Sequence, residues 1–449
     1  NYYLFYVYVI IFLTFCQTLY YIRGQYEVKM KSNIHKMASI IVAIILFVVS
    51  FFLIKEFTLN STNNHFIGKD VKIGLIAPLT GSSRSGGESM KKGVELAVNN
   101  INENGGIGGH KLTLIIRDDK GISSQAVKVA KDLIFLDNVE AIIGPFNSDS
   151  CLAIMGLVNN LEVPLITPIA MADNINLAND YVFRNTLGAS ASQMKINSFT
   201  KSSQDEYILL EGFGSKTIGI LWQGDKWGEE MQEIVLSDLI DLGREDALLF
   251  SEPFEIGGSD FSSFFKNHKD NYPDLMYIVS SGSESIDIVK AGREQDYKGL
   301  FYGEGGFNYE TFDEELLEYA DGCIFSTQWH PSFSTPMSDV FLEAYMQTYN
   351  DVPNMFTAIS YEAVYILKDS LVPIIHNLSR DDFRQILQKE LATPRTINGI
   401  TGPLSFDQNG QCDRPMFILQ KRWTGRNVQS VIVYPEKYSQ GQIDWNFEL

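Results

Sequence analysis

The segment between Val71 and Asp119 constrains the fold of this chain more than any other. It consists of an apolar run (VKIGLIAPLTG), an amphipathic stretch that ends in glycines (SMKKGVELAVNNINENGGIGG) and a second apolar run (HKLTLIIRDD). The middle stretch is predicted to be a helix because apolar residues recur at three- and four-residue intervals, at Val94, Ala97, Val98 and Ile101. Two strands joined by a crossover helix build a parallel sheet, and such a sheet binds ligands beyond the carboxyl ends of its strands.

The glycines that follow this helix are predicted to end it rather than to bind phosphate. Gly105 and Gly106 tolerate the positive φ that is common at a helix C-terminus. A phosphate-binding loop must follow a strand and open a helix, so that its amides point at the anion. The cluster here closes a helix and opens a strand, so nucleotide binding is not expected.

The same alternation of strand and helix patterns continues along the chain. After the pattern changes at residues 181–189 (YVFRNTLGA), a second series begins, with strands expected at 217–221, 248–254, 275–279 and 299–302. Residues 337–391 are predicted to be helical, and three short strands are expected at 404–406, 416–419 and 431–433. The sequence therefore predicts an α/β protein with two doubly wound parallel-sheet lobes.

Composition excludes some partners of the globular part. Against 36 Lys and Arg stand 55 Asp and Glu, which gives a formal net charge of −19. Such an acidic chain is poorly suited to nucleic acid or to an anionic lipid surface.

No catalytic, cofactor or metal motif stands out. The six histidines are scattered, and neither H-E-x-x-H nor G-x-S-x-G occurs. Asp118 and Asp119 are expected to end a strand and cap a loop. The four cysteines lack the paired spacing of zinc or redox motifs, so we expect buried thiols, with one disulfide left open: Cys16, Cys151, Cys323 and Cys412.

The N-terminal region is predicted to tether the chain to a membrane. Residues 38–54 are 17 uncharged residues preceded by lysines, as in an export segment, and they are interpreted as an uncleaved anchor, with a cleaved signal peptide as the alternative. Residues 1–22 are also apolar; either they are not native and the chain starts at Met30 or Met37, or they form a second span. Both interpretations leave the large domain outside the cell, with 58–69 as a polar tether.

An ordered set of sequence blocks carries a family resemblance. The blocks are VKIGLIAPLTG, NNINENGGIGGHKL, DDKGISSQAVKVAKDLI, AIIGPFNSDSCLAI, VPLITPIA, YVFRN, DKWGEEM, FSSFF and ITGPLSFDQNGQ. In this order and spacing, over residues 70–438, they resemble the type I periplasmic solute-binding proteins of the leucine/isoleucine/valine class, the receptors of ABC importers. The resemblance implies two lobes joined by three hinge segments, with a small-molecule ligand, an amino acid or an analogue, held in the cleft and read by an ABC permease.

The resemblance also implies where the domains divide. Residues 1–29 are an apolar segment and 30–69 a signal-anchor and tether. Lobe 1 is expected to comprise 70–188 and 330–404, and lobe 2 to comprise 189–329 and 405–440. The hinges are expected near 188–190, 326–330 and 402–406.

The ligand carboxylate is expected at the start of the helix that follows the Gly144-Pro145 loop. The resemblance places it at Ser148, with Asn147, Asp149 and Ser150 beside it. A helix N-terminus favours an anion, so the chemistry fits. The alternative is that Ser148 caps its own helix, and both roles can coexist.

The ligand ammonium group is expected at the loop after the next strand, at Ile169, Ala170 and Met171. Met171 stands where amino-acid binders often have threonine, which removes one hydroxyl acceptor. Glu304 of the second lobe is the candidate acidic partner, although its match is displaced by one position and a solvated loop carboxylate is the alternative.

Aromatic residues are expected to cover the ligand. Trp227 matches the family's covering ring, with packing against its own helix as the alternative. Gly86 and the pair Ser280-Ser281 stand where the family has other rings, which predicts a barer pocket for a larger ligand. Trp329, near the second hinge, is a candidate to compensate.

These observations predict an extracytoplasmic solute-binding receptor of an ABC importer with no catalytic residue, cofactor or metal. A ligand-sensing domain that signals to a membrane partner is the main alternative. An enzyme on the same fold is a third possibility, because fold alone does not fix function.

Overall fold

The computed structural model describes residues 70–176, 181–200, 216–258, 260–309, 315–375, 382–393 and 395–444. These residues belong to one compact unit, His65–Leu449. The predicted anchor, tether and upstream apolar segment lie outside the described residues. Among the residues that are described, no helix is both long enough and apolar enough to cross a membrane.

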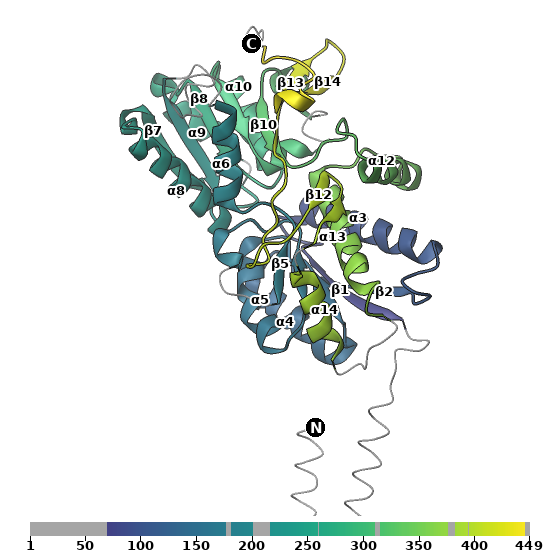
Figure 1. Ribbon diagram of the computed structural model, residues 1–449. Helices are drawn as coiled ribbons and strands as arrows, with labels where there is room; N and C mark the ends of the chain where they lie inside the picture. The colour runs from purple at the N-terminus through teal and green to yellow at the C-terminus, as the bar shows by residue number, and fades with distance from the viewer. Residues whose placement is uncertain are drawn as a thin grey trace, which may run out of the picture. The chain divides into compact units, whose positions relative to one another are not determined.

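A five-stranded parallel sheet forms the first lobe (Figure 1). Its strand order is β2-β1-β3-β4-β5, with bounds Val71–Ala77 (β1), Leu112–Asp118 (β2), Ala141–Ile143 (β3), Leu165–Thr167 (β4) and Val182–Arg184 (β5). The helices of this lobe are α3 (Arg84–Glu103), α4 (Ser123–Asp132), α5 (Ser148–Asn160), α13 (Met355–Leu371) and α14 (Phe383–Ala392). A π-helical turn, Leu133–Asp137, extends α4.

A seven-stranded sheet forms the second lobe, in the order β14-β13-β10-β9-β8-β6-β7. Five parallel strands come first along the chain: β6 (Ile218–Gln223), β7 (Leu248–Phe254), β8 (Leu275–Val279), β9 (Leu300–Gly303) and β10 (Ile324–Thr327). The antiparallel pair β13 (Phe417–Trp423) and β14 (Val428–Tyr434) extends the sheet beside β10. The helices are α6 (Ala189–Thr200), α8 (Lys226–Asp241), α9 (Ser262–Asn267) and α10 (Glu284–Glu294).

Two features lie outside these two groups of elements. They are helix α12 (Pro336–Tyr349) and the short hairpin of β11 (Ile397–Gly399) and β12 (Gly402–Leu404). Helix α13 packs closely on α3, because a Cβ at Gly93 would stand 2.2 Å from the carbonyl oxygen of Thr357. A C-terminal helix thus completes the core of the first lobe.

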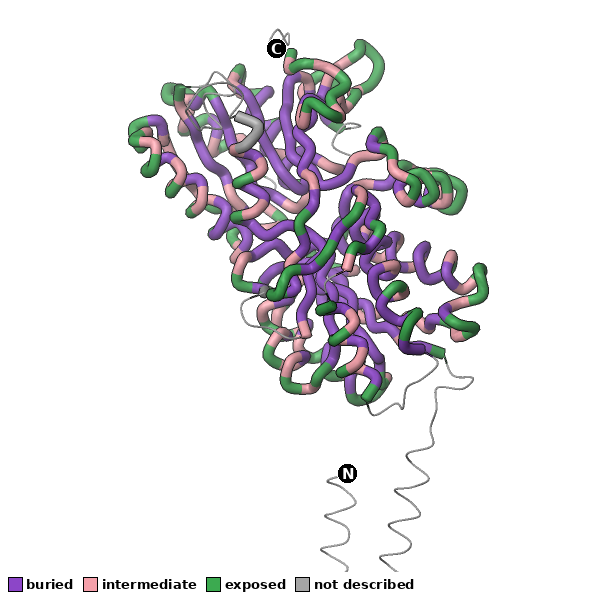
Figure 2. The backbone as a smooth tube through the Cα atoms, viewed as in Figure 1, coloured by how far each residue is buried: buried purple, intermediate pink, exposed green. Residues whose placement is uncertain are grey.

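Burial follows the predicted pattern. Figure 2 shows the strands buried and the outer helix faces exposed. The four apolar positions expected to face the core are all buried in α3, and every residue of β8 is buried, as in a strand covered on both faces. Gly105 and Gly106 adopt φ of +91° and +74° at the end of α3, as predicted. The prediction of two doubly wound α/β lobes is confirmed, and the β13–β14 hairpin makes the second sheet mixed.

The described chain passes between the two sheets three times: after β5, after β10 and before β13. These crossings are tied together, since Gln328 accepts a hydrogen bond from the amide of Leu187 (3.0 Å) and Gln411 donates one to the carbonyl of Thr186 (2.8 Å). Gln411 also forms a parallel bridge with Arg184 of β5. The third crossing therefore lies after Cys412, later than the hinge expected at 402–406, because edge pairing with β5 keeps the chain on the first sheet.

The structure also bears on two smaller predictions, one about the paired aspartates after β2 and one about the cysteines. Asp118 accepts hydrogen bonds from the amides of Leu79 (2.9 Å) and Lys120 (2.8 Å), and Asp119 accepts one from the amide of Gly121, so both organise loops as predicted. Within the described residues, Cys151, Cys323 and Cys412 are buried thiols.

Candidate functional site

A small cavity of about 40 Å³ lies between the two lobes. Residues from the carboxyl ends of β3, β4, β6, β8, β9 and β10 line it, which is where an open parallel sheet binds ligands. Of the nine residues predicted for the site, six lie here: Asn147, Ser148, Ile169, Met171, Trp227 and Glu304. The other three do not, since Asp149 is exposed and Ser150 and Ala170 are buried elsewhere.

Ser148 is the first residue of α5, and its side chain is buried. Its Oγ accepts hydrogen bonds from the amides of Met171 (3.2 Å) and Ala172 (3.1 Å), on the loop after β4. Because these bonds use the oxygen as acceptor, the hydroxyl proton remains available to a further acceptor. Ser148 is therefore not the cap of its own helix: Asn147 holds the cap position, and its Nδ2 donates to Ser83 Oγ at 3.0 Å.

The three residues predicted on the loop after β4 lie in different surroundings. Ile169 and Met171 line the cavity, while Ala170 packs into the core beneath β3 and β4. The carbonyl of Met171 accepts a hydrogen bond from the amide of Ala189 (2.8 Å), at the start of α6. The Met171 side chain belongs to the same hydrophobic cluster as Trp227 in the second lobe, so this loop also connects the two lobes.

Two buried carboxyl groups contribute the charge of the cavity. Glu304 follows β9, and its Oε1 accepts a hydrogen bond from the Tyr277 hydroxyl at 2.6 Å. Burial raises the pKa of Glu304 to about 7, against the lowering effect of the bond from Tyr277. Asp225 caps α8 by accepting from the amide of Gly228 (2.9 Å), and burial raises its pKa to about 6. A positive group entering the cavity would favour the ionised form of both.

Aromatic rings fill more of the cavity than the sequence suggested. Phe146 and Phe356 both line it, with ring centroids 5.2 Å apart. A Cβ at Gly86 would stand 2.2 Å from the Phe146 ring, so Phe146 occupies the space that the glycine leaves. These rings leave little free space in this arrangement, since 40 Å³ is well below the roughly 150 Å³ of an engineered cavity that admits benzene.

The two tryptophans singled out from the sequence have different roles. Trp227, the second residue of α8, is buried against the cavity, and its Nε1 has no hydrogen-bond partner among the residues described. Trp329 does not reach this cavity; its Nε1 donates to Ser338 Oγ at 2.9 Å, and its ring packs on Phe341.

Several lining residues were not predicted. Gln223 ends β6, and its Oε1 accepts from both the amide (2.7 Å) and the hydroxyl (2.9 Å) of Ser281, which follows β8. Together with Asp225, these residues follow strand ends, so the position of the strands could have identified them. Met416 comes from the third crossing, and no local sequence signal marks it.

A polar contact between the lobes lies near the cavity. Glu230 of α8 accepts hydrogen bonds from the amide of Asp173 (2.6 Å) and from Asn174 Nδ2 (3.3 Å), both on the loop after β4. Burial raises the pKa of Glu230. Glu230 therefore joins α8 of the second lobe to the loop after β4 of the first. Among the described residues, no group of His, Cys, Asp and Glu side chains is placed to hold a metal ion.

Comparison with known proteins relates this arrangement to one family. The model of the family described as periplasmic binding protein matches residues 70–426. A Leu/Ile/Val-binding protein of Rhizobium johnstonii is 24% identical over 359 residues, covering 80% of this chain and 93% of that protein. The Leu/Ile/Val-binding protein of Escherichia coli K12 is 24% identical, covering 78% and 89%.

Solved structures share the fold. The branched-chain amino acid transporter substrate-binding protein LivJ of Streptococcus pneumoniae, in complex with isoleucine, has a TM-score of 0.70 at 23% identity and covers 82% of this chain and 100% of its own. A solute-binding protein of an ABC transporter from Rhodopseudomonas palustris, in complex with benzoate, has a TM-score of 0.70 at 18% identity, with 82% and 98% covered. Members of the matched family are solute-binding proteins rather than enzymes. With its two α/β lobes, three crossings and interlobe cavity, the chain belongs to the periplasmic binding protein family, in the type I class that includes the Leu/Ile/Val-binding proteins.

Proposed function

We propose that this protein is the extracytoplasmic solute-binding receptor of an ABC importer, and that it holds an amino acid or a related small polar molecule in the interlobe cavity. The observation that carries the proposal is the pairing in one cavity of a hydroxyl donor at a helix start, Ser148, with a buried carboxyl group, Glu304. These two groups complement the two charged ends of an amino acid. The named relatives of the chain bind such molecules or other small organic acids.

The carboxylate end of the ligand is assigned to the start of α5. Ser148 Oγ is fixed by two amide donors, so its proton points away from them and is available to an anion. The positive end of the 13-residue helix lies at the same place. A carboxylate there would gain a charge-assisted hydrogen bond and the favourable end of the helix dipole.

The ammonium end is assigned to Glu304. Without a ligand, burial keeps the pKa of this group near 7, so its negative charge is easily lost. An ammonium group beside it would stabilise the ionised form and gain a paired charge in a water-poor site. Trp227 and Phe146 would enclose the apolar part of the ligand.

Ligand entry requires the lobes to part. The closed cavity of about 40 Å³ is small, and the Glu230 contact bridges the lobes beside it. A ligand that touches both lobes binds best in the closed state, so binding shifts an open–closed equilibrium. A permease can then distinguish the loaded receptor from the empty one. We further propose that residues 38–54 hold the receptor at the outer face of the cell membrane, which fractionation of cell envelopes would test.

The experiment is calorimetric titration of the purified protein with amino acids, amides and small organic acids, preceded by native mass spectrometry to identify retained molecules. For an amino acid that binds, Ser148→Ala is expected to weaken binding by about 1 to 3 kcal/mol. Ser124→Ala, at an exposed position on α4, is the matched control. Unchanged affinity in Ser148→Ala would remove the assigned carboxylate contact, and silence with every class of ligand would count against transport. Neighbouring genes for a kinase rather than a permease would favour sensing.

A further inference from the structure

Among the residues described, every charged side chain that lines the interlobe cavity is acidic. Asp225 and Glu304 line it, and the described lining contains no Lys, Arg or His. An amino acid bound at Ser148 and Glu304 brings one ammonium group, and that group is used by Glu304. A ligand of that kind would leave Asp225 as a second carboxyl group in the cavity without a positive partner.

The described hydrogen-bond donors to the Asp225 carboxyl group are both neutral. Its Oδ1 accepts from the amide of Gly228 at 2.9 Å, and its Oδ2 accepts from Gln223 Nε2 at 2.5 Å. The neighbouring Lys226 is paired with acidic residues of its own helix. Burial raises the pKa of Asp225 to about 6, against the lowering effect of the two bonds, and the charge of Asp149 on α5 adds to the rise. A carboxylate offers about four acceptor positions, so Asp225 can accept further bonds from a ligand.

The position of Asp225 as the cap of α8 does not account for its charge. Asn caps a helix about as well as Asp, because either side-chain oxygen accepts a hydrogen bond from the amide. The helix dipole favours an anion at this place. Burial outweighs that benefit, since the pKa of Asp225 is raised rather than lowered. The negative charge is therefore unfavourable in the empty cavity, and a positive ligand group would stabilise it.

The two carboxyl groups are spaced by the second sheet. Asp225 follows β6 and Glu304 follows β9, and β8 lies between these strands. Adjacent strands are about 4.8 Å apart, so the two strand ends are about 10 Å apart. Contacts across the end of β8 fix this spacing: Gln223 accepts from Ser281, and a Cβ at Gly305 would stand 2.9 Å from the Ser281 Cα. The two groups are thus placed for positive charges at two ends of one ligand, joined by a flexible stem such as the four-carbon stem of lysine.

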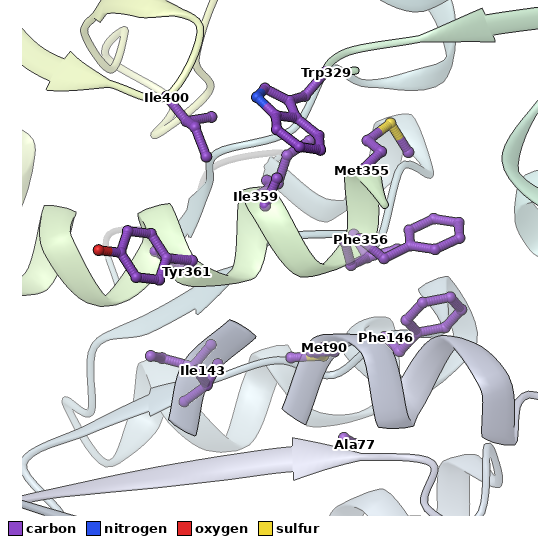
Figure 3. Close-up of a cluster of buried hydrophobic side chains, with 14 of the residues drawn as sticks. Ala77, Met90, Ile143, Phe146, Trp329, Met355, Phe356, Ile359, Tyr361 and Ile400 are labelled. Atoms are coloured by element: carbon purple, nitrogen blue, oxygen red, sulfur yellow. The ribbon is translucent and has the colours of Figure 1, made fainter. Parts of the chain in front are cut away.

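The apolar lining suits such a stem. Trp227, two residues after Asp225, lines the cavity, and the face of an indole ring attracts a cation. Figure 3 shows Met355 and Phe356 at the start of α13, with Phe146 across from them. Methionine side chains are flexible and adapt to the shape of what they contact. Three of them line the cavity: Met171, Met355 and Met416.

A buried hydroxyl group in the lining also lacks a partner. Ser192 of α6 lines the cavity with 0% of its surface exposed, and its Oγ has no hydrogen-bond partner among the described residues. A hydroxyl oxygen accepts hydrogen bonds as well as donating one, so a ligand with several N–H groups would satisfy it. A branched apolar side chain cannot, and an unsatisfied buried polar group lowers affinity.

We propose that the interlobe cavity selects a basic amino acid, with the α-ammonium group at Glu304 and the side-chain cation at Asp225. This inference rests on the proposed function and deepens it, because it names the class of ligand. Leucine, isoleucine and valine would leave the Asp225 carboxyl group unpaired. The chain is thereby set apart from its relatives that are named for binding those three amino acids.

The test is calorimetric titration of the complete chain with leucine and with two matched pairs, arginine with citrulline and lysine with norleucine. In at least one pair the basic member is expected to bind at least about tenfold more tightly than its neutral counterpart, because only the basic member pairs with Asp225. Asp225→Asn keeps an oxygen for the helix cap and is expected to remove this preference, while binding of the neutral counterpart stays the same. Asp241→Asn removes a negative charge from an exposed position at the other end of α8, and as the matched control it should keep the preference.

The outcomes separate this inference from the proposed function. If a neutral amino acid binds as tightly as arginine and lysine, the inference is overturned while the amino-acid receptor stands. If the preference for a basic amino acid survives in Asp225→Asn, the assignment of the side-chain cation to Asp225 is overturned. If no amino acid binds, the proposed function and this inference both fail. Circular dichroism establishes that each variant folds, and if Asp225→Asn does not fold, the ranking of ligands by the unmodified protein decides alone.

Discussion

Glu304 offers the sharpest test of the electrostatics of the interlobe cavity. The residue is 3% exposed, and its carboxylate accepts a hydrogen bond from the Tyr277 hydroxyl. Burial raises its pKa from 4.5 to about 7. Since one pKa unit corresponds to about 1.4 kcal/mol, the ionised form of Glu304 costs the folded protein about 3 kcal/mol in the absence of ligand.

The expected pH dependence follows from which state holds the proton. Below pH 4.5 Glu304 is protonated in both the folded and the unfolded protein, and it carries no penalty. Between about pH 4.5 and 7 the folded protein keeps the proton and the unfolded chain loses it, so the free energy of unfolding falls as pH rises. Above pH 7 the full penalty is present. Glu304→Gln stays neutral at every pH, and its amide oxygen can still accept from Tyr277.

The assay is urea unfolding of the ligand-free protein at pH 4, 6 and 8.5. Glu304→Gln is expected to match the unmodified protein at pH 4 and to exceed its free energy of unfolding by about 3 kcal/mol at pH 8.5. Glu294→Gln, at an exposed position at the end of α10, controls for the loss of one negative charge. If Glu304→Gln and the unmodified protein lose stability in parallel between pH 4 and 8.5, the argument from burial fails.

Two further substitutions test packing near the crossings and the cavity. Arg414 Nη2 lies 3.0 Å from Glu362 Oε1, and both side chains are almost completely buried. Glu362→Ala leaves the Arg414 charge without this partner and should lower the free energy of unfolding, measured with denaturant, by about 3 to 5 kcal/mol. Replacing both residues with Met should recover much of that loss, and a mild effect of the single change would show that the pair is unimportant. Gly86→Ala should lower the free energy of unfolding by about 1 to 3 kcal/mol and should reduce ligand affinity, because the added Cβ would displace the Phe146 ring into the cavity. A variant with unaltered melting temperature and ligand affinity would contradict this prediction.

Local sequence patterns predicted the helices and strands well, but they predicted less well which distant segments of the chain lie side by side. The strands expected at 248–254 and 275–279 match β7 and β8, because a short stretch rich in apolar residues and bounded by turn residues is a local property. Helix α4 ends its α-helical part at Asp132 and continues as a π-helical turn, a distinction that apolar periodicity does not reveal. The third crossing was placed too early, because the bridge between Arg184 and Gln411 joins residues far apart in the chain.

In the candidate site, too, some features could be predicted from the sequence and others could not. Ser148 and Trp227 could be named from the sequence because each opens a helix within a recognisable block, and Glu304 could be named because it follows an expected strand. The acceptor role of the Ser148 hydroxyl could not be predicted, since its two donors belong to a loop more than twenty residues away. The contact between the Phe146 ring and Gly86 could not be predicted either. A glycine in the sequence shows that no side chain occupies that space, but it does not show which other residue fills it.

By itself, the sequence determined the two α/β lobes, the order of their elements and the family, since apolar periodicity and the spacing of turn residues are properties of short stretches of chain. The tertiary structure alone decided the size of the interlobe cavity and the raised pKa of Glu304. The physical reason is that volume, desolvation and the local sum of charges depend on side chains brought together from distant segments, and these surroundings exist only after the lobes have packed.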